Sequence, residues 1–269
     1  MSDEELVLQK TAEAAERSGD FETALAVWRN LSSIDVNRPD YLCMLGSVAQ
    51  KLGRWAHAEQ AFLDAIEAAS KLKAIPRTTE SPEIVDKTLS LAMGLLGSLF
   101  LARTDGDRPA NAQRAKEWLE QAVEVTPNQA WLSFLGSAHV RLGEKEDAKA
   151  AFRKVIELDE TYAEAYFNLG LLLADDGQNV EAEKMLRRAT ELDPNSSRAH
   201  GRLGILLREQ GRYSEAESEL RRAVGVNPTD KTARFYLSQV LGSAGSRSIA
   251  PRTKAARSVR KMEDPRPNA

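Results

Sequence analysis

A leucine followed by a small residue recurs every 34 residues through the second half of the chain. The small residues are Gly136, Gly170 and Gly204, and Ser238 takes the next place in the series. Glycine inside a helix costs about 1 kcal/mol relative to alanine, so its return at a fixed interval requires a structural reason. A constant period of this length is the signature of a chain built from stacked copies of one small motif.

Other positions recur in register with these glycines. A second glycine follows after seven residues, an alanine after twelve, a large apolar residue after sixteen, and Val or Ala after nineteen. Each copy is therefore predicted to be a helix, a glycine turn, a second helix and a closing turn, which is marked in the last two copies by Pro194 and Pro228. The recurring residues are Gly143, Ala148, Phe152 and Val155, then Gly177, Ala182, Leu186 and Ala189, then Gly211, Ala216, Leu220 and Ala223.

These spacings resemble the tetratricopeptide repeat family. The resemblance extends towards the N-terminus through Gly46, Ala58 and Phe62, and more loosely through Ala24 and Trp28. It implies an all-α fold, a right-handed α-solenoid of about six helix-turn-helix repeats whose first helices line a concave groove. The implied repeats are residues 5–38, 39–72, 83–128, 129–162, 163–196 and 197–230, and a terminal helix follows at 231–243.

The first glycine of each repeat is expected to allow close packing of the two helices. We expect Gly170 to let Leu169 and Ala182 interlock, so that burial offsets the lost helix propensity. On this hypothesis, Gly170→Leu lowers the melting temperature.

The third repeat departs from this pattern. An interruption at residues 73–82 precedes it, and the turn "TDGDRPAN" is about six residues longer than its counterparts. Ser81 is expected to cap a long helix that begins at Pro82 and ends near Arg103. The first glycine of each repeat is its framework glycine. In this helix either Gly94 or Gly97 can take that place, so the sequence leaves the alignment of the third repeat undecided. A bend at the interruption would separate residues 1–72 from the rest.

Composition restricts the class of protein. With 42% hydrophobic and 29% charged residues, the chain reads as a soluble globular protein, and the single cysteine fits a reducing, cytoplasmic compartment. The N-terminal stretch is acidic and does not resemble a signal peptide. No run approaches the roughly 18 apolar residues that span a bilayer, so no membrane insertion is expected.

The charge is unevenly distributed along the chain. Residues 246–269 carry seven Lys or Arg and two acidic residues, and are predicted to form a disordered basic tail after a solenoid at residues 1–245. Nucleic-acid binding by this tail is the alternative function. However, the tail lacks aromatic residues for stacking, and the acidic remainder of the chain would repel a phosphate backbone.

No catalytic or metal site is predicted. His57, His139 and His200 lie in different repeats and lack metal-ligand spacing, so they are interpreted as packing or surface residues. Cys43 occupies a position expected to face the groove, but no histidine accompanies it as an activating base. We therefore expect a non-enzymatic chain with no cofactor and no metal.

The candidate peptide-binding residues are those that the resemblance places in the groove of the last two repeats: Phe167, Asn168, Arg198, Arg202 and Arg208. In co-chaperone members of the family, a carboxylate clamp holds the C-terminal acid of a peptide. Asn168, Arg198 and Arg202 match three of its five positions, whereas Ser133 and Ser137 replace the first lysine and asparagine. The alternative is that these are exposed groove residues with salt-bridge partners of their own.

The sequence thus predicts a scaffold or adaptor that binds a peptide segment of a partner protein, with an acidic or C-terminal carboxylate segment as the favoured ligand. The terminal helix carries Phe235, Leu237 and Leu241. We expect it either to pack wholly against the sixth repeat or to mediate self-association. Partner identity does not follow from the fold.

Overall fold

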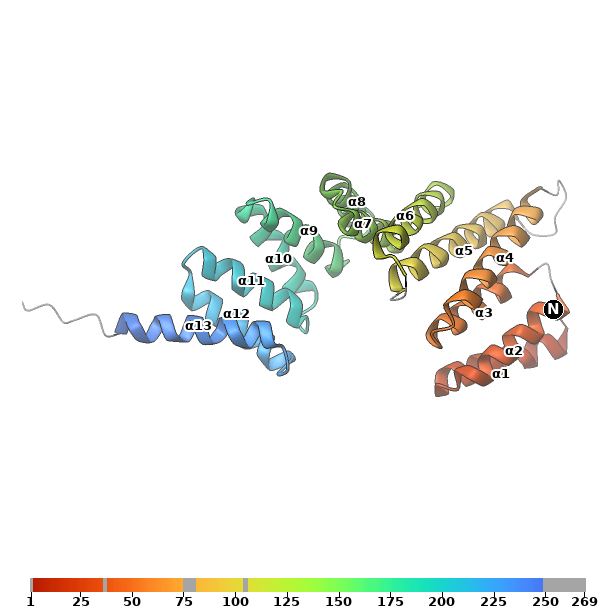
Figure 1. The fold of residues 1–269 in the computed structure, drawn as a ribbon, viewed down its shortest axis with the longest axis horizontal. Helices are drawn as coiled ribbons and strands as arrows, with labels where there is room; N and C mark the ends of the chain where they lie inside the picture. Colours follow the sequence, from red (N-terminus) through yellow and green to blue (C-terminus); the bar gives the residue numbers. More distant parts are fainter. Residues whose placement is uncertain (1, 36–37, 75–80, 104–105, 249–269) are drawn as a thin grey trace, which may run out of the picture. The chain divides into compact units, whose positions relative to one another are not determined.

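The computed structural model describes residues 2–35, 38–74, 81–103 and 106–248. The chain forms two compact units, Met1–Pro194 and Asn195–Ala269, hereafter the N-terminal and C-terminal units. In both, the described residues form α-helices joined by short turns, which confirms the all-α prediction (Figure 1). The N-terminal unit includes residues 1–72, so the interruption at 73–82 does not divide it.

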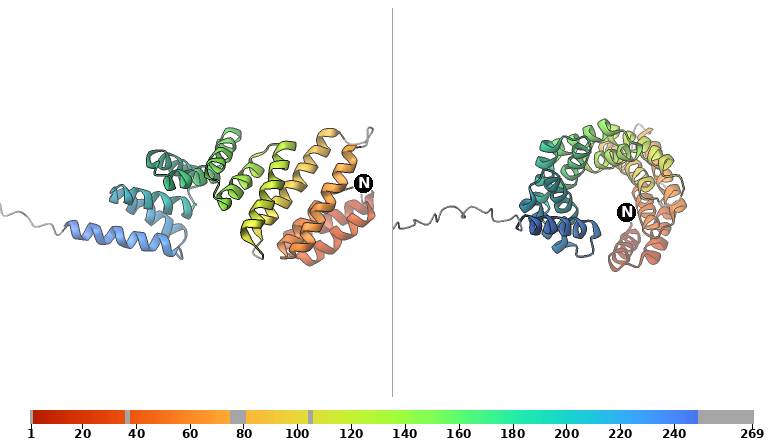
Figure 2. Two further views of the ribbon diagram at one scale, coloured as in Figure 1. Left: turned by 45° about the horizontal axis from the view of Figure 1, so that its top comes forward. Right: turned by 60° about the vertical axis from the view of Figure 1, so that its left-hand side comes forward.

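The N-terminal unit contains five helix pairs, and every helix packs against the next (Figure 2). In addition, α5 packs against both α3 and α7, so first helices of neighbouring pairs also meet. The ten helices are α1 (Asp3–Ser18), α2 (Phe21–Ile34), α3 (Pro39–Lys51), α4 (Trp55–Ala74), α5 (Pro82–Ala102), α6 (Arg108–Val125), α7 (Gln129–Leu142), α8 (Lys145–Leu158), α9 (Ala163–Asp175) and α10 (Asn179–Leu192).

The C-terminal unit contains one helix pair and a further helix among its described residues. These are α11 (Ser197–Glu209), α12 (Tyr213–Val226) and α13 (Lys231–Ser248), and α13 packs against both others. The terminal helix therefore ends at Ser248, not at residue 243, and it includes the first residues of the predicted tail. The rest of that tail lies outside the described residues, and the predicted division at residue 245 stays a prediction.

Local sequence signals explain where the helices begin and end. Ser81 accepts a hydrogen bond from the Ile84 N–H and Pro82 occupies the first position of α5, as the sequence predicts. The turn inside each regular repeat contains a glycine with positive φ. Gly143, for example, has a φ of 77° and its N–H donates to the carbonyl of Val140 at the end of α7.

The framework glycines lie where two helices of one repeat come closest. A Cβ built on Gly170 would lie 2.9 Å from Leu186 Cγ, and one on Gly204 would lie 2.7 Å from Leu220 Cγ. The residue that Gly170 accommodates is therefore Leu186, sixteen positions later. The expected interlocking of Leu169 with Ala182 stays a prediction. The same sixteen-residue relation joins Gly46 to Phe62 and Gly136 to Phe152.

The same test settles the register of the third repeat. A Cβ on Gly97 would lie 2.6 Å from Leu119 Cγ on α6, whereas one on Gly94 would lie 2.4 Å from the indole of Trp131 on α7. Gly97 is thus the framework residue, and its partner comes 22 positions later because the intervening turn is longer. The missing side chain of Gly94 instead leaves space for the indole of Trp131, in the following helix pair.

Helix α5 is the most apolar element of the fold. By length and composition alone it could span a membrane. This corrects the expectation that no segment of the chain is long and apolar enough to do so. More than half of its apolar stretch is buried inside the fold, where it packs against α3, α4, α6 and α7. A core helix of a folded protein has these same properties.

Candidate functional site

Two of the five candidate groove residues lie one turn apart on α11 of the C-terminal unit. The side chains of Arg198 and Arg202 are exposed, while the opposite side of the helix buries Leu203 and Leu207. Ser196 caps α11 by accepting a hydrogen bond from the Ala199 N–H. Because residues four apart share a helix face, the two guanidinium groups are presented on the same side.

Arg208 has a different environment from these two arginines. It is half-buried, and its guanidinium carbon lies 5.2 Å from the ring centroid of Tyr236 on α13. This is within the range of a cation–π interaction. Arg208 therefore links α11 to α13 within the C-terminal unit.

The other two candidates lie on α9 of the N-terminal unit. Phe167 is buried, with only 4% of its surface exposed, so little of its ring is available to a ligand. Asn168 is half-buried and its Nδ2 donates a hydrogen bond to Glu164 Oε1 at 3.3 Å. The predicted clamp therefore draws on residues of both units, and α11 alone carries its two exposed arginines.

Cys43 does not face a groove, contrary to the expectation from its position. Only 1% of its surface is exposed, and it packs with Ala65 of α4 and Ala92 of α5. Burial raises the pKa of its thiol to about 12, so the reactive thiolate is scarce at neutral pH. Cys43 is a small core residue.

The histidines match their interpretation as packing or surface residues. His200 is buried and its Nδ1 lies 2.6 Å from Glu219 Oε2 on α12, whereas His57 is exposed at the start of α4. His139 is buried at the end of α7.

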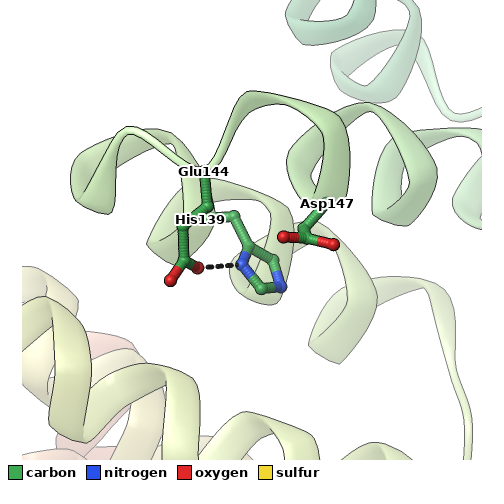
Figure 3. Close-up of side chains that lie close together, drawn as sticks. All are labelled: His139, Glu144 and Asp147. Atoms are coloured by element: carbon green, nitrogen blue, oxygen red, sulfur yellow. Dashed lines mark hydrogen bonds and ion pairs between the residues drawn. The ribbon is translucent and has the colours of Figure 1, made fainter.

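Among the described residues, one cluster of side chains has the chemistry and spacing to hold a metal ion, and His139 belongs to it. Figure 3 shows its imidazole with Glu144 on one side and Asp147 on the other, all three at the α7–α8 turn. However, Glu144 accepts hydrogen bonds from Lys116 Nζ at 2.8 Å and contacts His139 Nδ1 at 2.6 Å, and these interactions lower its pKa. A cation would have to displace both partners, so the cluster is better described as a link between α6, α7 and α8.

A second group of arginines was not predicted from the sequence. Arg103, Arg108 and Arg141 line a pocket of about 470 Å³ in the N-terminal unit, together with Leu101, Ala102 and Pro109. The one available signal was Arg108 in the unusually long third-repeat turn. Nothing in the spacing of the sequence places Arg141 beside it.

Comparisons with known proteins agree with the repeat architecture. Family models described as tetratricopeptide repeat match residues 11–30, 39–72, 108–160, 134–197 and 173–237. No curated protein sequence is similar enough to count as a relative.

Two solved structures share the fold at low sequence identity. One is YrrB, described as a TPR protein with an unusual peptide-binding site: 19% identity, a TM-score of 0.56, and coverage of 77% of this chain and 96% of YrrB. The other is the Cut9–Hcn1 hetero-tetramer of APC/C: 15% identity, a TM-score of 0.66, and coverage of 88% of this chain but only 42% of the matched one.

Proposed function

This chain belongs to the tetratricopeptide repeat family, and from that premise we propose that it is a non-enzymatic scaffold that binds a peptide segment of a partner protein. The fold supports this proposal, because stacked helix pairs offer a preformed surface and avoid much of the ordering cost of binding. The peptide-binding site named for YrrB and the complex named for Cut9 and Hcn1 show that proteins of similar fold bind other chains.

The preferred ligand in this proposal is a segment that ends in a carboxylate. The observation that carries it is the exposed pair on α11, where Arg202 has no ion-pair partner in the described part of the chain and Arg198 lies one turn away. Guanidinium groups donate two parallel hydrogen bonds to a carboxylate, so two of them on one face favour an acidic terminus. Asn168 belongs to the other unit, and the proposal rests on α11 alone.

Fluorescence anisotropy with paired peptides tests this proposal. The two peptides share one acidic sequence and differ only in a free or an amidated C-terminus. We expect Arg202→Gln to weaken binding of the free-acid peptide about tenfold, because a hydrogen bond to a charged group contributes about 1.5–3 kcal/mol. Binding of the amidated peptide is expected to be weaker from the start and to change little in the variant.

The matched control is Arg221→Gln, which removes an exposed arginine of α12 that is paired with Glu217 on its own helix. It is expected to bind both peptides as the wild type does. Equal affinity for the two peptides, or an unchanged affinity in Arg202→Gln, would exclude a carboxylate site on α11.

A further inference from the structure

The pocket lined by Arg103, Arg108 and Arg141, hereafter the arginine pocket, lies where three helices of the N-terminal unit meet. Leu101 and Ala102 end α5, Arg108 and Pro109 begin α6, and Arg141 lies near the end of α7. Its volume of about 470 Å³ falls within the range of roughly 300–1,000 Å³ that ligand pockets occupy. None of the candidate groove residues lines it.

The described lining of the arginine pocket carries positive charge. Among the residues that the structure describes, those that line it include three arginines and no acidic side chain. Arg103 Nη1 contacts Glu59 Oε2 at 2.7 Å, but the other oxygen of Glu59 also pairs with Arg114, at 3.2 Å. One carboxylate is therefore shared between two guanidinium groups.

The remaining two arginines have no carboxylate partner in the described part of the chain. Arg141 Nη1 donates a hydrogen bond to the carbonyl oxygen of Leu101 at 2.5 Å, which orients the side chain without neutralising it. Arg108 is exposed at the first turn of α6. Since a guanidinium has five N–H donors, each of these side chains keeps donors for a ligand.

We propose that the arginine pocket binds a phosphate-type dianion carried by a phosphorylated side chain of a partner protein. A phosphate monoester carries a charge of about −1.5 to −2 at pH 7 and three acceptor oxygens, whereas a carboxylate carries one charge and two oxygens. Three guanidinium groups around one pocket match the charge and the three oxygens of a phosphate monoester better than those of a carboxylate. Arg103 and Arg141 are held in place by Glu59 and Leu101, so little ordering is needed when the anion enters.

Phosphate binding by the arginine pocket does not depend on the proposed scaffold function. Only the statement that a partner protein carries the phosphate rests on that proposed function. The two are separated by their probes. Inorganic phosphate tests the pocket without any peptide, and the acid-terminated peptides test α11, so either proposal can fail while the other stands.

Isothermal titration calorimetry of the full chain tests the pocket with three probes at constant ionic strength. These are inorganic phosphate, acetate, and a capped tripeptide whose central residue is phosphoserine. We expect saturable one-to-one binding of both phosphates, weaker or undetectable binding of acetate, and the tightest binding for the phosphoserine tripeptide. Arg108→Gln is expected to weaken phosphate binding about tenfold.

Arg29→Gln is the matched control, because Arg29 is an exposed arginine of α2 outside the pocket. It is expected to bind all probes as the wild type does. Absence of saturable phosphate binding, or equal binding by Arg108→Gln and the wild type, would refute the pocket. Acetate binding as tight as phosphate would refute the dianion, and inorganic phosphate binding tighter than the phosphoserine tripeptide would refute a partner-borne source.

Discussion

Two glycines of α11, three residues apart, have opposite steric surroundings. A Cβ on Gly204 would lie 2.7 Å from Leu220 Cγ and 3.2 Å from the carbonyl oxygen of Ala216, whereas one on Gly201 would have only the Cβ of Ala223 nearby, at 3.9 Å. Gly204 is therefore required by packing between the helices. Gly201 is buried but has room for a methyl group.

This contrast predicts opposite effects of one substitution. Gly201→Ala gains about 1 kcal/mol of helix propensity and makes an ordinary contact, so it should raise the free energy of unfolding of the C-terminal unit. Gly204→Ala gains the same propensity but forces Leu220 or a helix to move, and overpacking of this kind costs about 1–3 kcal/mol. Urea denaturation followed by far-UV circular dichroism measures both. Stabilisation by Gly204→Ala, or destabilisation by Gly201→Ala, would contradict this account.

The glycine framework could be predicted from the sequence because its steric requirement recurs at a fixed spacing. The period of Gly136, Gly170 and Gly204 predicts both the helix pairs and their turns. Burial of Cys43 and Phe167 could not be predicted in this way. A helical position gives the direction of a side chain, but its exposure depends on which side chains of neighbouring helices cover it.

The same limit applies to the two groups of arginines. Arg198 and Arg202 lie four residues apart on one helix, so a local pattern is sufficient to place them together. Arg103, Arg108 and Arg141 come from three helices, and their meeting depends on how α5, α6 and α7 pack. The long third-repeat turn marks this part of the chain as unusual without indicating its chemistry.

At the scale of elements, α8 and α9 are joined by one carboxylate. Asp176 follows the last residue of α9 and contacts Lys149 Nζ at 2.7 Å and Lys145 Nζ at 3.1 Å, both on α8. Only 4% of the Lys149 side chain is exposed, so this lysine depends on its carboxylate partners for compensation of its charge. Asp176 thus connects two successive helix pairs of the N-terminal unit.

This link predicts a pH-dependent effect of Asp176→Asn. Hydrogen bonds from Lys149 and then Lys145 lower the pKa of Asp176 below its usual 3.8. A carboxyl whose pKa is lowered by folding stabilises the fold above its unfolded pKa, and that contribution is lost as the pH falls through the folded pKa. The variant should therefore melt at a lower temperature than the wild type at neutral pH, and the difference should narrow below pH 3.8.

Asp175→Asn is the control for this measurement, because Asp175 is exposed and has no ion-pair partner in the described residues. Scanning calorimetry at neutral and acidic pH should give it the melting temperature of the wild type at each. If the deficit of Asp176→Asn stayed constant as the pH fell, ionisation of that carboxyl would not be the cause.

At the scale of the whole molecule, the two compact units differ in size and in their spectroscopic probes. The N-terminal unit contains ten described helices and the C-terminal unit three. All four tryptophans, Trp28, Trp55, Trp118 and Trp131, belong to the N-terminal unit. Tryptophan fluorescence therefore reports on one unit alone, while far-UV circular dichroism reports on both.

We predict that the two units unfold as separate cooperative steps. The smaller unit has the smaller core and should unfold at lower urea concentration, so the circular dichroism transition should begin before the fluorescence transition.

Leu220→Ala removes a fully buried side chain of α12, and such a truncation costs about 2–5 kcal/mol. It should move the early part of the circular dichroism curve and leave the fluorescence midpoint in place. Phe152→Ala, in the core at α8, should move the fluorescence midpoint. Coincident transitions in the wild type, together with a fluorescence midpoint that shifts in Leu220→Ala, would mean that the repeats unfold as one cooperative stack, because neighbour contacts would then couple the stability of every helix pair to the next.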